Sequence, residues 1–287
     1  MTSMFEMTKA VVSKAQSLGA DVAGMASIQA LRTSPSHCIY PKIGMDLDKH
    51  WSEARAGEEV AWPDAALSAV VIGVVHPAHK PEMDWWDGKG TPGNRVLMGI
   101  NKELSAWLET SLGIQTWKLP YLIEKGGIFL KDAAVMAGLG CVGKNNLVIT
   151  PEYGPQIRFR ALLMNQEAEP TGPVSFHPCQ GCDQPCRRVC PIQAFAKRVY
   201  SQKELHQEAL PATDGTYDRQ TCNQKMGQDI EDAVQAMTGK DNEQQALRRS
   251  IDAFEQEAGA GQDRTSEYCV RYCRQCELSC PVGAKLR

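Results

Sequence analysis

Cysteines are concentrated near the C-terminal end of the chain, and this clustering constrains the fold more than any other sequence feature. Nine of the eleven lie between Cys179 and Cys280, and only Cys38 and Cys141 precede them. They form two compact groups, each ending in a Cys-Pro pair, with one cysteine alone between them: Cys179, Cys182, Cys186 and Cys190; Cys222; Cys269, Cys273, Cys276 and Cys280. Such close spacing indicates metal binding, because one loop can supply several thiolates to one centre.

The Cys-Pro endings favour two 4Fe–4S clusters with crossed ligands. In two-cluster ferredoxins the last cysteine of a group, followed by proline, opens a helix that leads to the other cluster. The predicted ligand sets are Cys179, Cys182, Cys186 and Cys280 for one cluster, and Cys190, Cys273, Cys276 and one of Cys222 or Cys269 for the other. Zinc, a single cluster and disulfides are the alternatives. The first group has one residue more than usual before Cys186, and we expect the loop to absorb it at Pro185.

Charge and hydropathy argue against two broad classes of function. The formal net charge is −3, so the chain lacks the general basic character of a protein that binds nucleic acid through phosphates. No apolar run reaches the length of about eighteen residues that a transmembrane helix needs, and residues 1–9 do not resemble a signal peptide. We therefore expect a cytoplasmic protein with no membrane partner, in a compartment where thiols stay reduced.

The remaining pattern predicts an α+β protein of two domains. Residues 1–166 are expected to form an α/β domain with a mixed sheet, and residues 167–287 the cysteine-bearing domain, with a helical insert at 224–258. Hydrophobic periodicity and turn residues predict helices at 5–18, 94–112 and 128–137, and strands at 21–28, 67–75, 114–119, 146–149 and 159–164. The last two strands are expected to form a hairpin around residues 151–155.

A glycine-rich loop lies between the helix predicted at 128–137 and the strand predicted at 146–149. It contains Gly138, Leu139, Gly140, Cys141, Val142, Gly143, Lys144 and Asn145. The GxGxxG spacing alone suggests a dinucleotide site, but a helix rather than a strand precedes it, which argues against that interpretation. Two interpretations stay open: a tight turn, or close approach of the backbone to a large planar ligand, since both need glycine.

Residues 137–149, followed by Tyr153-Gly154 and the two cysteine groups, resemble epoxyqueuosine reductases and, more widely, the cobalamin-dependent iron–sulfur reductases that include reductive dehalogenases. The resemblance implies a nitroreductase-like α/β domain followed by a two-cluster ferredoxin-like domain. It further implies a base-off cobalamin at residues 138–145 and Cys222 as the eighth cluster ligand. A flavin in the same pocket is the weaker alternative. Cys141 departs from the family pattern, which usually has tryptophan there.

Other side chains are weighed against ordinary structural roles. Glu124 falls near the position of the family's acidic proton donor, and Tyr121 and Lys125 are further candidates. His76 follows a predicted strand and could ligate a metal, although a simple loop histidine is the stronger interpretation. Arg187 and Arg188, beside the first cysteine group, could dock an acidic electron donor or form a solvated helix face.

The sequence thus predicts an oxidoreductase, working without oxygen, that passes electrons through two clusters to cobalamin and reduces a small-molecule substrate. The expected electron donor is a ferredoxin or flavodoxin. One alternative is an electron-transfer or activating protein that reduces a corrinoid protein or another partner's cofactor. Another is a short epoxyqueuosine reductase acting on tRNA. We expect tRNA to be a poor candidate partner, because the family's tRNA-binding extension is missing after Arg287 and the balance of charge is acidic.

Overall fold

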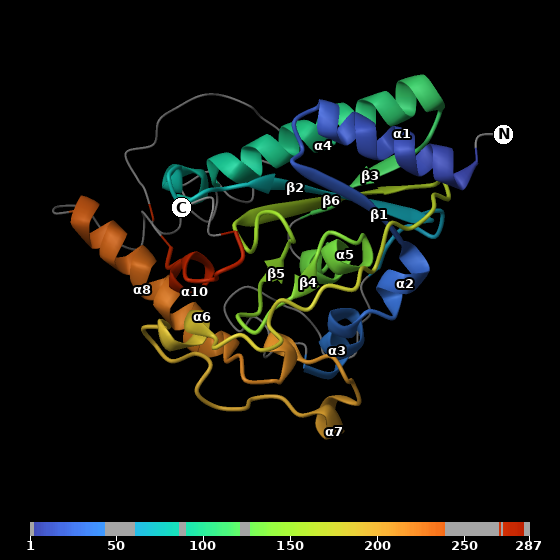
Figure 1. Ribbon diagram of the computed structural model, residues 1–287. Coiled ribbons are helices and arrows are strands. Elements are labelled where there is room, and N and C mark those ends of the chain that lie inside the picture. The colour runs from blue at the N-terminus through green and yellow to red at the C-terminus, as the bar shows by residue number, and fades with distance from the viewer. Residues whose placement is uncertain are drawn as a thin grey trace.

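The computed structural model describes residues 3–43, 61–85, 90–120, 127–238, 270 and 272–283. Within these residues, none of the helices combines the length and the apolar character needed to cross a membrane. The α+β character predicted from the sequence is confirmed, because helices pack on an extended sheet in the first part of the chain (Figure 1).

The central sheet has four strands in the order β1 (Val22–Ser27), β2 (Ser68–Val75), β6 (Ile157–Met164) and β3 (Thr116–Lys118). Every neighbouring pair is antiparallel, so the predicted mixed sheet is wrong. The connection from β1 to β2 starts and ends at the same end of the sheet, because Ser27 pairs with Ser68, and a connection of this kind produces antiparallel neighbours. Strand β2 lies inside the sheet and is buried up to its last residue, as its run of valine and isoleucine predicts.

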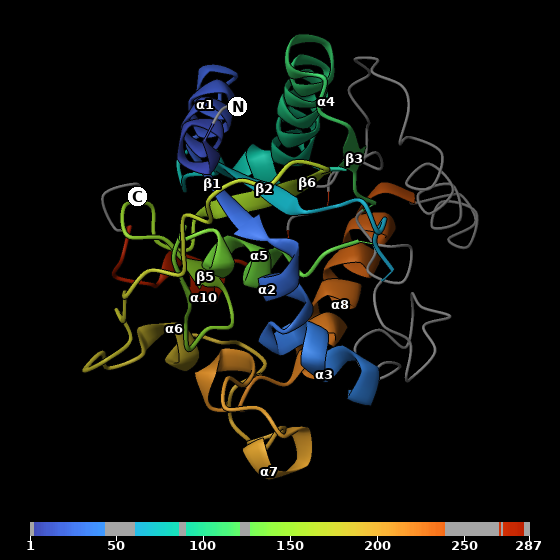
Figure 2. The ribbon, with the colours of Figure 1, turned by 90° about the vertical axis from the view of Figure 1, so that its right-hand side faces the viewer.

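Helices cover both faces of the sheet (Figures 1 and 2). Those on one face are α1 (Met4–Ser17) and α4 (Pro92–Leu112), and those on the other are α2 (Ile28–Arg32) and α5 (Leu130–Met136). Side chains alternate along β2 because successive strand residues point to opposite faces. Val70, Ile72 and Val74 pack toward α1 and α4, whereas Ala69 and Val71 pack toward α2 and α5.

Local sequence signals fix the ends of α4, close to the predicted bounds 94–112. The Thr91 hydroxyl accepts a hydrogen bond from the backbone of Asn94, and Pro92 occupies the first turn, where a missing N–H costs nothing. Gly113 ends the helix in the left-handed region at φ 66°. The helix α3 (Pro35–Ile43) lies in the segment 33–64, for which loops with short helices were predicted.

The second part of the chain has little regular structure around its cysteines. Its elements are α6 (Pro185–Arg188), α7 (Gln202–Leu205), the 3-10 helix η4 (Pro211–Thr213), α8 (Arg219–Thr238) and α10 (Gln275–Leu278). Figures 1 and 2 place them on the side of the sheet that carries α5. The helix α8 starts before the predicted insert, and residues 239–258 of that insert lie outside the described residues.

Two predictions about the middle of the chain need comment. The hairpin expected around residues 151–155 is wrong, because β5 (Val148–Ile149) pairs with β4 (Cys141–Val142), while β6 joins the central sheet. The domain boundary near residue 166 stays a prediction. Beyond it, Thr171 still contacts the first part: its hydroxyl donates to the Ala137 carbonyl at 2.6 Å, and its N–H donates to the Met25 carbonyl at 3.0 Å.

Candidate metal centres

Four cysteines from both ends of the second part line one pocket. This first thiol group consists of Cys179, Cys182, Cys186 and Cys280, and Pro178, Gln184 and Pro281 line the same pocket. Cys280 interacts electrostatically with the other three thiols. Burial, with these neighbours, raises the pKa of Cys280 to about 11. A raised pKa means that the buried thiolate form is costly. A metal centre would offset that cost, because it binds the thiolate form.

Backbone N–H groups point at the sulfurs of the first thiol group. Lys144 N–H donates to Cys179 Sγ and Gln184 N–H to Cys182 Sγ, both at 3.4 Å. The N–H groups of Arg187 and Val282 hydrogen-bond to Cys186 and Cys280. Converging N–H groups make a concavity suited to an anionic group such as a thiolate-bound cluster.

The extra residue between Cys182 and Cys186 is accommodated by one unusual backbone conformation. Gln184 adopts φ 58° and ψ 52°, in the left-handed region, immediately before Pro185 opens α6. Pro185 itself takes the first helical position, where proline is well tolerated. The sequence therefore located the distortion to within one residue.

Four further cysteines form a second thiol group. It consists of Cys190, Cys222, Cys273 and Cys276, whose thiols interact electrostatically with one another. Burial, followed by the effect of Cys222 and Cys273, raises the pKa of Cys276 to about 12. Ala194 N–H donates to Cys190 Sγ at 3.3 Å. Cys269, the alternative to Cys222, lies outside the described residues.

Each thiol group therefore contains cysteines from both of the compact cysteine groups of the sequence. Cys190 belongs to the first cysteine group of the sequence but lies in the second thiol group. Cys280 belongs to the last cysteine group of the sequence but lies in the first thiol group. This is the crossed arrangement that the Cys-Pro endings predict. The role of these cysteines as iron ligands stays a prediction.

The glycine loop lies against both thiol groups. It forms the β4–β5 hairpin, whose turn reaches into the second part of the chain. Lys144 donates its N–H to Cys179 Sγ and accepts a 2.8 Å hydrogen bond from Arg187 Nε on its carbonyl. Asn145 Nδ2 donates to the Cys276 carbonyl at 3.3 Å. Residues 138–145 are thus placed where a cofactor could exchange electrons with both groups.

Packing within the chain accounts for the three glycines of this loop. A Cβ on Gly140 would lie 2.2 Å from the Ile149 carbonyl oxygen, and one on Gly138 would lie 2.4 Å from the Thr171 carbonyl oxygen. A Cβ on Gly143 would lie 2.4 Å from Ile149 Cδ1. The faces left open by these glycines are filled by protein, so the tight-turn interpretation explains them. A cofactor would contact other surfaces of the loop.

Cys141 is placed beside the first thiol group, where its thiol interacts electrostatically with Cys179 and Cys280. Burial is the main cause that raises its pKa to about 11. The residue that departs from the family pattern therefore adds a fifth thiol next to the predicted cluster.

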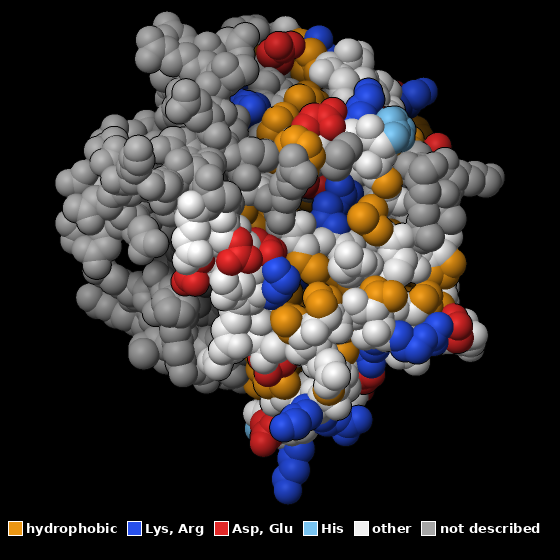
Figure 3. Space-filling model, turned by 90° about the vertical axis from the view of Figure 1, so that its left-hand side faces the viewer, with side chains coloured by type: hydrophobic (Ala, Val, Ile, Leu, Met, Phe, Trp, Pro, Cys, Tyr) orange, Lys and Arg blue, Asp and Glu red, His pale blue; other side chains and the backbone are white. Residues whose placement is uncertain are grey.

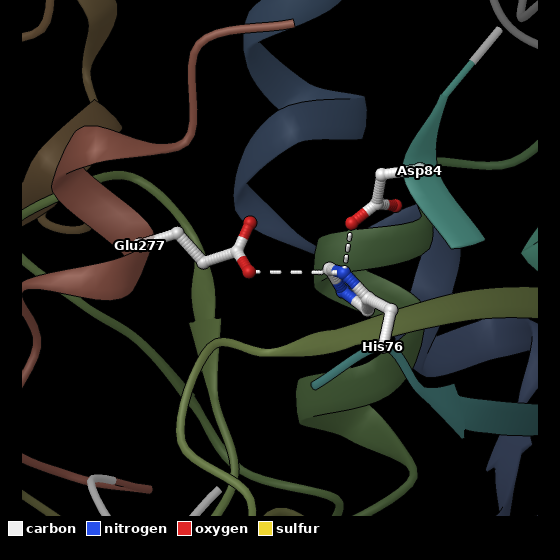
Figure 4. Close-up of side chains that lie close together, drawn as sticks. All are labelled: His76, Asp84 and Glu277. Carbon is white, nitrogen blue, oxygen red and sulfur yellow. Dashed lines mark hydrogen bonds and ion pairs between the residues drawn. The ribbon is translucent and has the colours of Figure 1, made fainter. Parts of the chain in front are cut away.

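A buried ionic network holds α10 against the end of the central sheet (Figure 4). Asp84 contacts His76 Nδ1 and Arg158 Nε, and Arg274 Nη1 lies 2.9 Å from Asp84 Oδ2. Arg274 also pairs with Glu277, whose Oε1 lies 3.7 Å from His76 Nδ1. Arg274 Nη2 lies 2.9 Å from His76 Nδ1 and 2.7 Å from the His76 carbonyl oxygen. Because the Asp84 carboxylate only accepts, His76 Nδ1 donates to Asp84, and Arg274 Nη2 donates to the His76 carbonyl.

His76, Asp84 and Glu277 are close enough together to hold a metal ion. Two guanidinium groups already contact these carboxylates, so positive and negative charges balance without a metal. Burial alone would raise the pKa of Asp84, but the hydrogen bond from His76 and the charges of His76, Arg158 and Arg274 outweigh burial and lower it. We therefore interpret the network as an ionic clamp. Sequence reasoning missed it because its members are far apart in the chain.

The two neighbouring arginines of α6 differ in environment. Arg187 is turned inward, with 14% of its side chain exposed, and its two Nη atoms contact the Asp214 carboxylate at 2.8 and 3.0 Å. Arg188 is 60% exposed and pairs with the exposed Asp183. The suggestion that both arginines form a docking or solvated face is therefore wrong for Arg187.

The predicted proton donors cannot be placed. Tyr121, Glu124 and Lys125 lie outside the described residues. His76 is buried in the ionic clamp rather than in a simple loop position, whereas His79, three residues later, is exposed.

Comparisons with known proteins find relatives among two kinds of reductase. Epoxyqueuosine reductase of Synechocystis is 31% identical over 140 residues, covering 46% of this chain and 47% of that protein. Tetrachloroethene reductive dehalogenase of Sulfurospirillum multivorans is 31% identical over 80 residues, covering 26% of this chain and 16% of that protein. The chain spans less than half the length of these curated relatives. No protein-family model matches it.

Solved structures share the fold. Epoxyqueuosine reductase of Bacillus subtilis gives a TM-score of 0.60 at 19% identity, covering 98% of this chain and 66% of that one. The Streptococcus thermophilus enzyme gives 0.58 at 20% identity, covering 98% of this chain and 67% of that one. The shared fold and matched sequences relate the chain to a class of reductases. Within that class it is a relative of the epoxyqueuosine reductases. The separate match over 80 residues connects it with a reductive dehalogenase.

Proposed function

We propose that this chain is an iron–sulfur reductase that holds two 4Fe–4S clusters and passes electrons to a bound corrinoid. The observation that carries the proposal is the sorting of eight cysteines into two groups of four, each drawn from both ends of the second part. Four thiolates are the usual ligand set of a 4Fe–4S cluster. Hydrogen bonds from backbone N–H groups to the sulfurs support the fit, because they stabilise thiolate charge.

The proposed corrinoid site is the glycine loop, residues 138–145. Its support is the position of the loop, where Lys144 and Asn145 contact the segments that carry Cys179 and Cys276. A base-off corrinoid, when bound, supplies a strongly reducing and nucleophilic cobalt. The β4–β5 hairpin would orient that group beside the clusters. Glu124 is proposed to deliver a proton to the product, with Tyr121 as the alternative donor.

The first test is the metal content of the protein purified and reconstituted without oxygen. We expect about eight irons per chain, the content of two 4Fe–4S clusters. Cys190→Ser should remove about four of them, whereas Cys38→Ser, which changes a cysteine of α3 outside both thiol groups, should leave the content unchanged. Zinc in place of iron, or equal effects of the two substitutions, would refute the cluster assignment.

The second test is titration with hydroxocobalamin, followed by visible and EPR spectra. Tight binding with a base-off cobalt signal supports the reductase, and Glu124→Gln should then retain binding and lose turnover. Eight irons without any corrinoid binding would refute corrinoid reduction in this chain. That result would favour the activating protein that delivers electrons to a partner's cofactor.

A second candidate function is reduction of epoxyqueuosine in tRNA. A structural relative has been crystallised with an epoxyqueuosine-modified tRNA stem-loop, so tRNA is a plausible partner, and our expectation against it is not supported. The test is expression of the chain in bacteria that lack their own epoxyqueuosine reductase, with nucleoside analysis of bulk tRNA. Conversion of epoxyqueuosine to queuosine would establish tRNA as substrate. Unchanged epoxyqueuosine, with a reconstituted and reducible protein, would point to another substrate.

The proposed electron donor is a small acidic redox protein such as a ferredoxin or flavodoxin. Figure 3 shows the side of the molecule on which α6 and α10 lie, with basic side chains gathered toward the end where Figure 1 places α7. Lys197, Arg198 and Lys203 are exposed in this region. Charge complementarity of this kind raises association rates and makes them sensitive to salt. Reduction by ferredoxin should therefore slow as ionic strength rises.

A further inference from the structure

Two side chains outside the cysteine motifs flank the second thiol group. Tyr217 lies just before α8, and its hydroxyl hydrogen-bonds to the Sγ of Cys222. Lys131, in the first turn of α5, places Nζ 5.9 Å from the centroid of the Tyr217 ring. Its ammonium group interacts electrostatically with the thiols of Cys222 and Cys276. A hydrogen-bond donor and a cation therefore converge on one edge of this group.

The first thiol group has a different set of hydrogen bonds and nearby charges. The hydrogen bonds to its sulfurs come from backbone N–H groups. Arg187, a cation that interacts electrostatically with Cys186 of this group, has both Nη atoms on the Asp214 carboxylate, which balances its charge. The two groups thus have the same number of cysteines in different electrostatic environments.

Such differences control reduction potential. Reduction adds one electron to a 4Fe–4S cluster, with no bond formed or broken, and makes the cluster more negative. Positive charge nearby and hydrogen bonds to the sulfurs favour the more negative form and so raise the potential. A buried cation acts strongly because water screens it little.

We propose that Lys131 and Tyr217 raise the reduction potential of the cluster held by Cys190, Cys222, Cys273 and Cys276, above the value that the same four cysteines would give alone. This inference rests on the proposed function, because it requires that the second thiol group hold a 4Fe–4S cluster. Lys131 and Tyr217 are positioning residues that act through the cluster and are not ligands.

The test is a redox titration of the reconstituted protein, with dithionite as reductant and EPR detection of each reduced cluster. Lys131→Met and Tyr217→Phe should each lower the reduced-to-oxidised ratio of one cluster, at a fixed potential, by about threefold to tenfold. A tenfold change corresponds to about 59 mV for a one-electron couple. Lys131→Arg keeps the positive charge and should restore most of the ratio. Lys102→Met, which removes an exposed lysine from α4, is the matched control and should change nothing.

The outcomes separate this inference from the proposed function. Absence of iron in the unmodified protein defeats the proposed function itself. If two clusters form and neither Lys131→Met nor Tyr217→Phe changes a potential, the inference is wrong. An equal shift of both clusters also overturns it, because a general change in structure would then be the cause. Should Lys131→Met lose its iron, Tyr217→Phe decides alone, since it removes only one hydroxyl group.

Discussion

Replacing Arg187 by methionine should destabilise the protein far more than the same change at its neighbour Arg188. The Arg187 guanidinium donates to both carboxylate oxygens of Asp214, to the Lys144 carbonyl and to the Ala212 carbonyl, the last two at 2.8 Å. It also lies 5.6 Å from the centroid of the Phe195 ring. These contacts connect the glycine loop with residues 212–214, so their loss should loosen the second part of the chain.

The magnitude follows from burial. Breaking a well-buried ion pair costs about 3–5 kcal/mol, and a surface pair is worth about 0–1 kcal/mol. The Arg187 side chain is 14% exposed but that of Asp214 is 35% exposed, so screening reduces the ionic part to about 2 kcal/mol. Two hydrogen bonds to carbonyl oxygens add about 0.5–1 kcal/mol each. Arg187→Met should therefore lower the free energy of unfolding by about 3 kcal/mol.

The assay is urea unfolding without oxygen, followed by circular dichroism, on variants with matched iron content. Arg188→Met is the control, because its partner Asp183 is 77% exposed, and the expected loss is about 0–1 kcal/mol. Equal losses in the two variants would refute the reasoning that assigns Arg187 an inward role. So would additive effects of Arg187→Met and Asp214→Asn, since groups in contact should couple.

The pH dependence offers an independent check of the same pair. The hydrogen bonds and charge of Arg187, with help from Thr216, outweigh burial and lower the pKa of Asp214 to about 2. A carboxyl whose folded pKa lies below its unfolded value of about 3.8 stabilises the fold above that value. The stability gap between the unmodified protein and Arg187→Met should be full above about pH 4 and shrink as pH falls toward about 2.

Three further outcomes test other parts of the molecule. Gly140→Ala should destabilise the fold by about 1–3 kcal/mol, because the added Cβ would meet the Ile149 carbonyl oxygen. Gly99→Ala should instead stabilise the fold by about 0.5–1 kcal/mol, because Gly99 lies in the middle of α4 with open space around it. Urea unfolding measures both changes. Arg274→Met should cost about 3–5 kcal/mol by the same measurement, since it leaves two buried carboxylates short of a cation. Burial and then the charge of Arg32 lower the pKa of His37 to about 4. The unfolded chain therefore binds a proton more readily than the folded one, and the free energy of unfolding should fall by about 3 kcal/mol between about pH 6.5 and 4. Urea titrations across this pH range should show a flatter slope for His37→Asn.

Features set by local sequence were predictable. The strand β2 follows from its run of β-branched residues, and α4 from its apolar periodicity with Gly113 as stop signal. The sorting of cysteines is also partly local, because short spacings bring the cysteines of one loop together, and the cysteine that precedes proline joins the other group. These signals depend on neighbours in the chain, which a single sequence displays.

Features set by tertiary context were not predictable. Strand β5 has two residues, too short for its own pattern to indicate whether it pairs with β4 or β6. Arg187 and Arg188 are identical in type and adjacent, and only the direction of each side chain from a one-turn helix separates an inward cation from an exposed one. The ionic clamp gathers residues from positions 76 to 277, so no local pattern reveals it.

The crossed arrangement has a consequence for how the second part assembles. Neither thiol group is complete until the segment that carries Cys273, Cys276 and Cys280 returns to the first cysteine group. The described contacts that hold this segment come from α6 and α8 and also from the first part of the chain. Asp84 binds Arg274, and Gln156 Nε2 donates to the Gly283 carbonyl at 3.2 Å. On the proposed assignment, cluster binding and docking of α10 on the sheet therefore stabilise each other, because metal-site formation contributes directly to folding free energy. Loss of the Arg274 contacts should then weaken cluster retention as well as the fold.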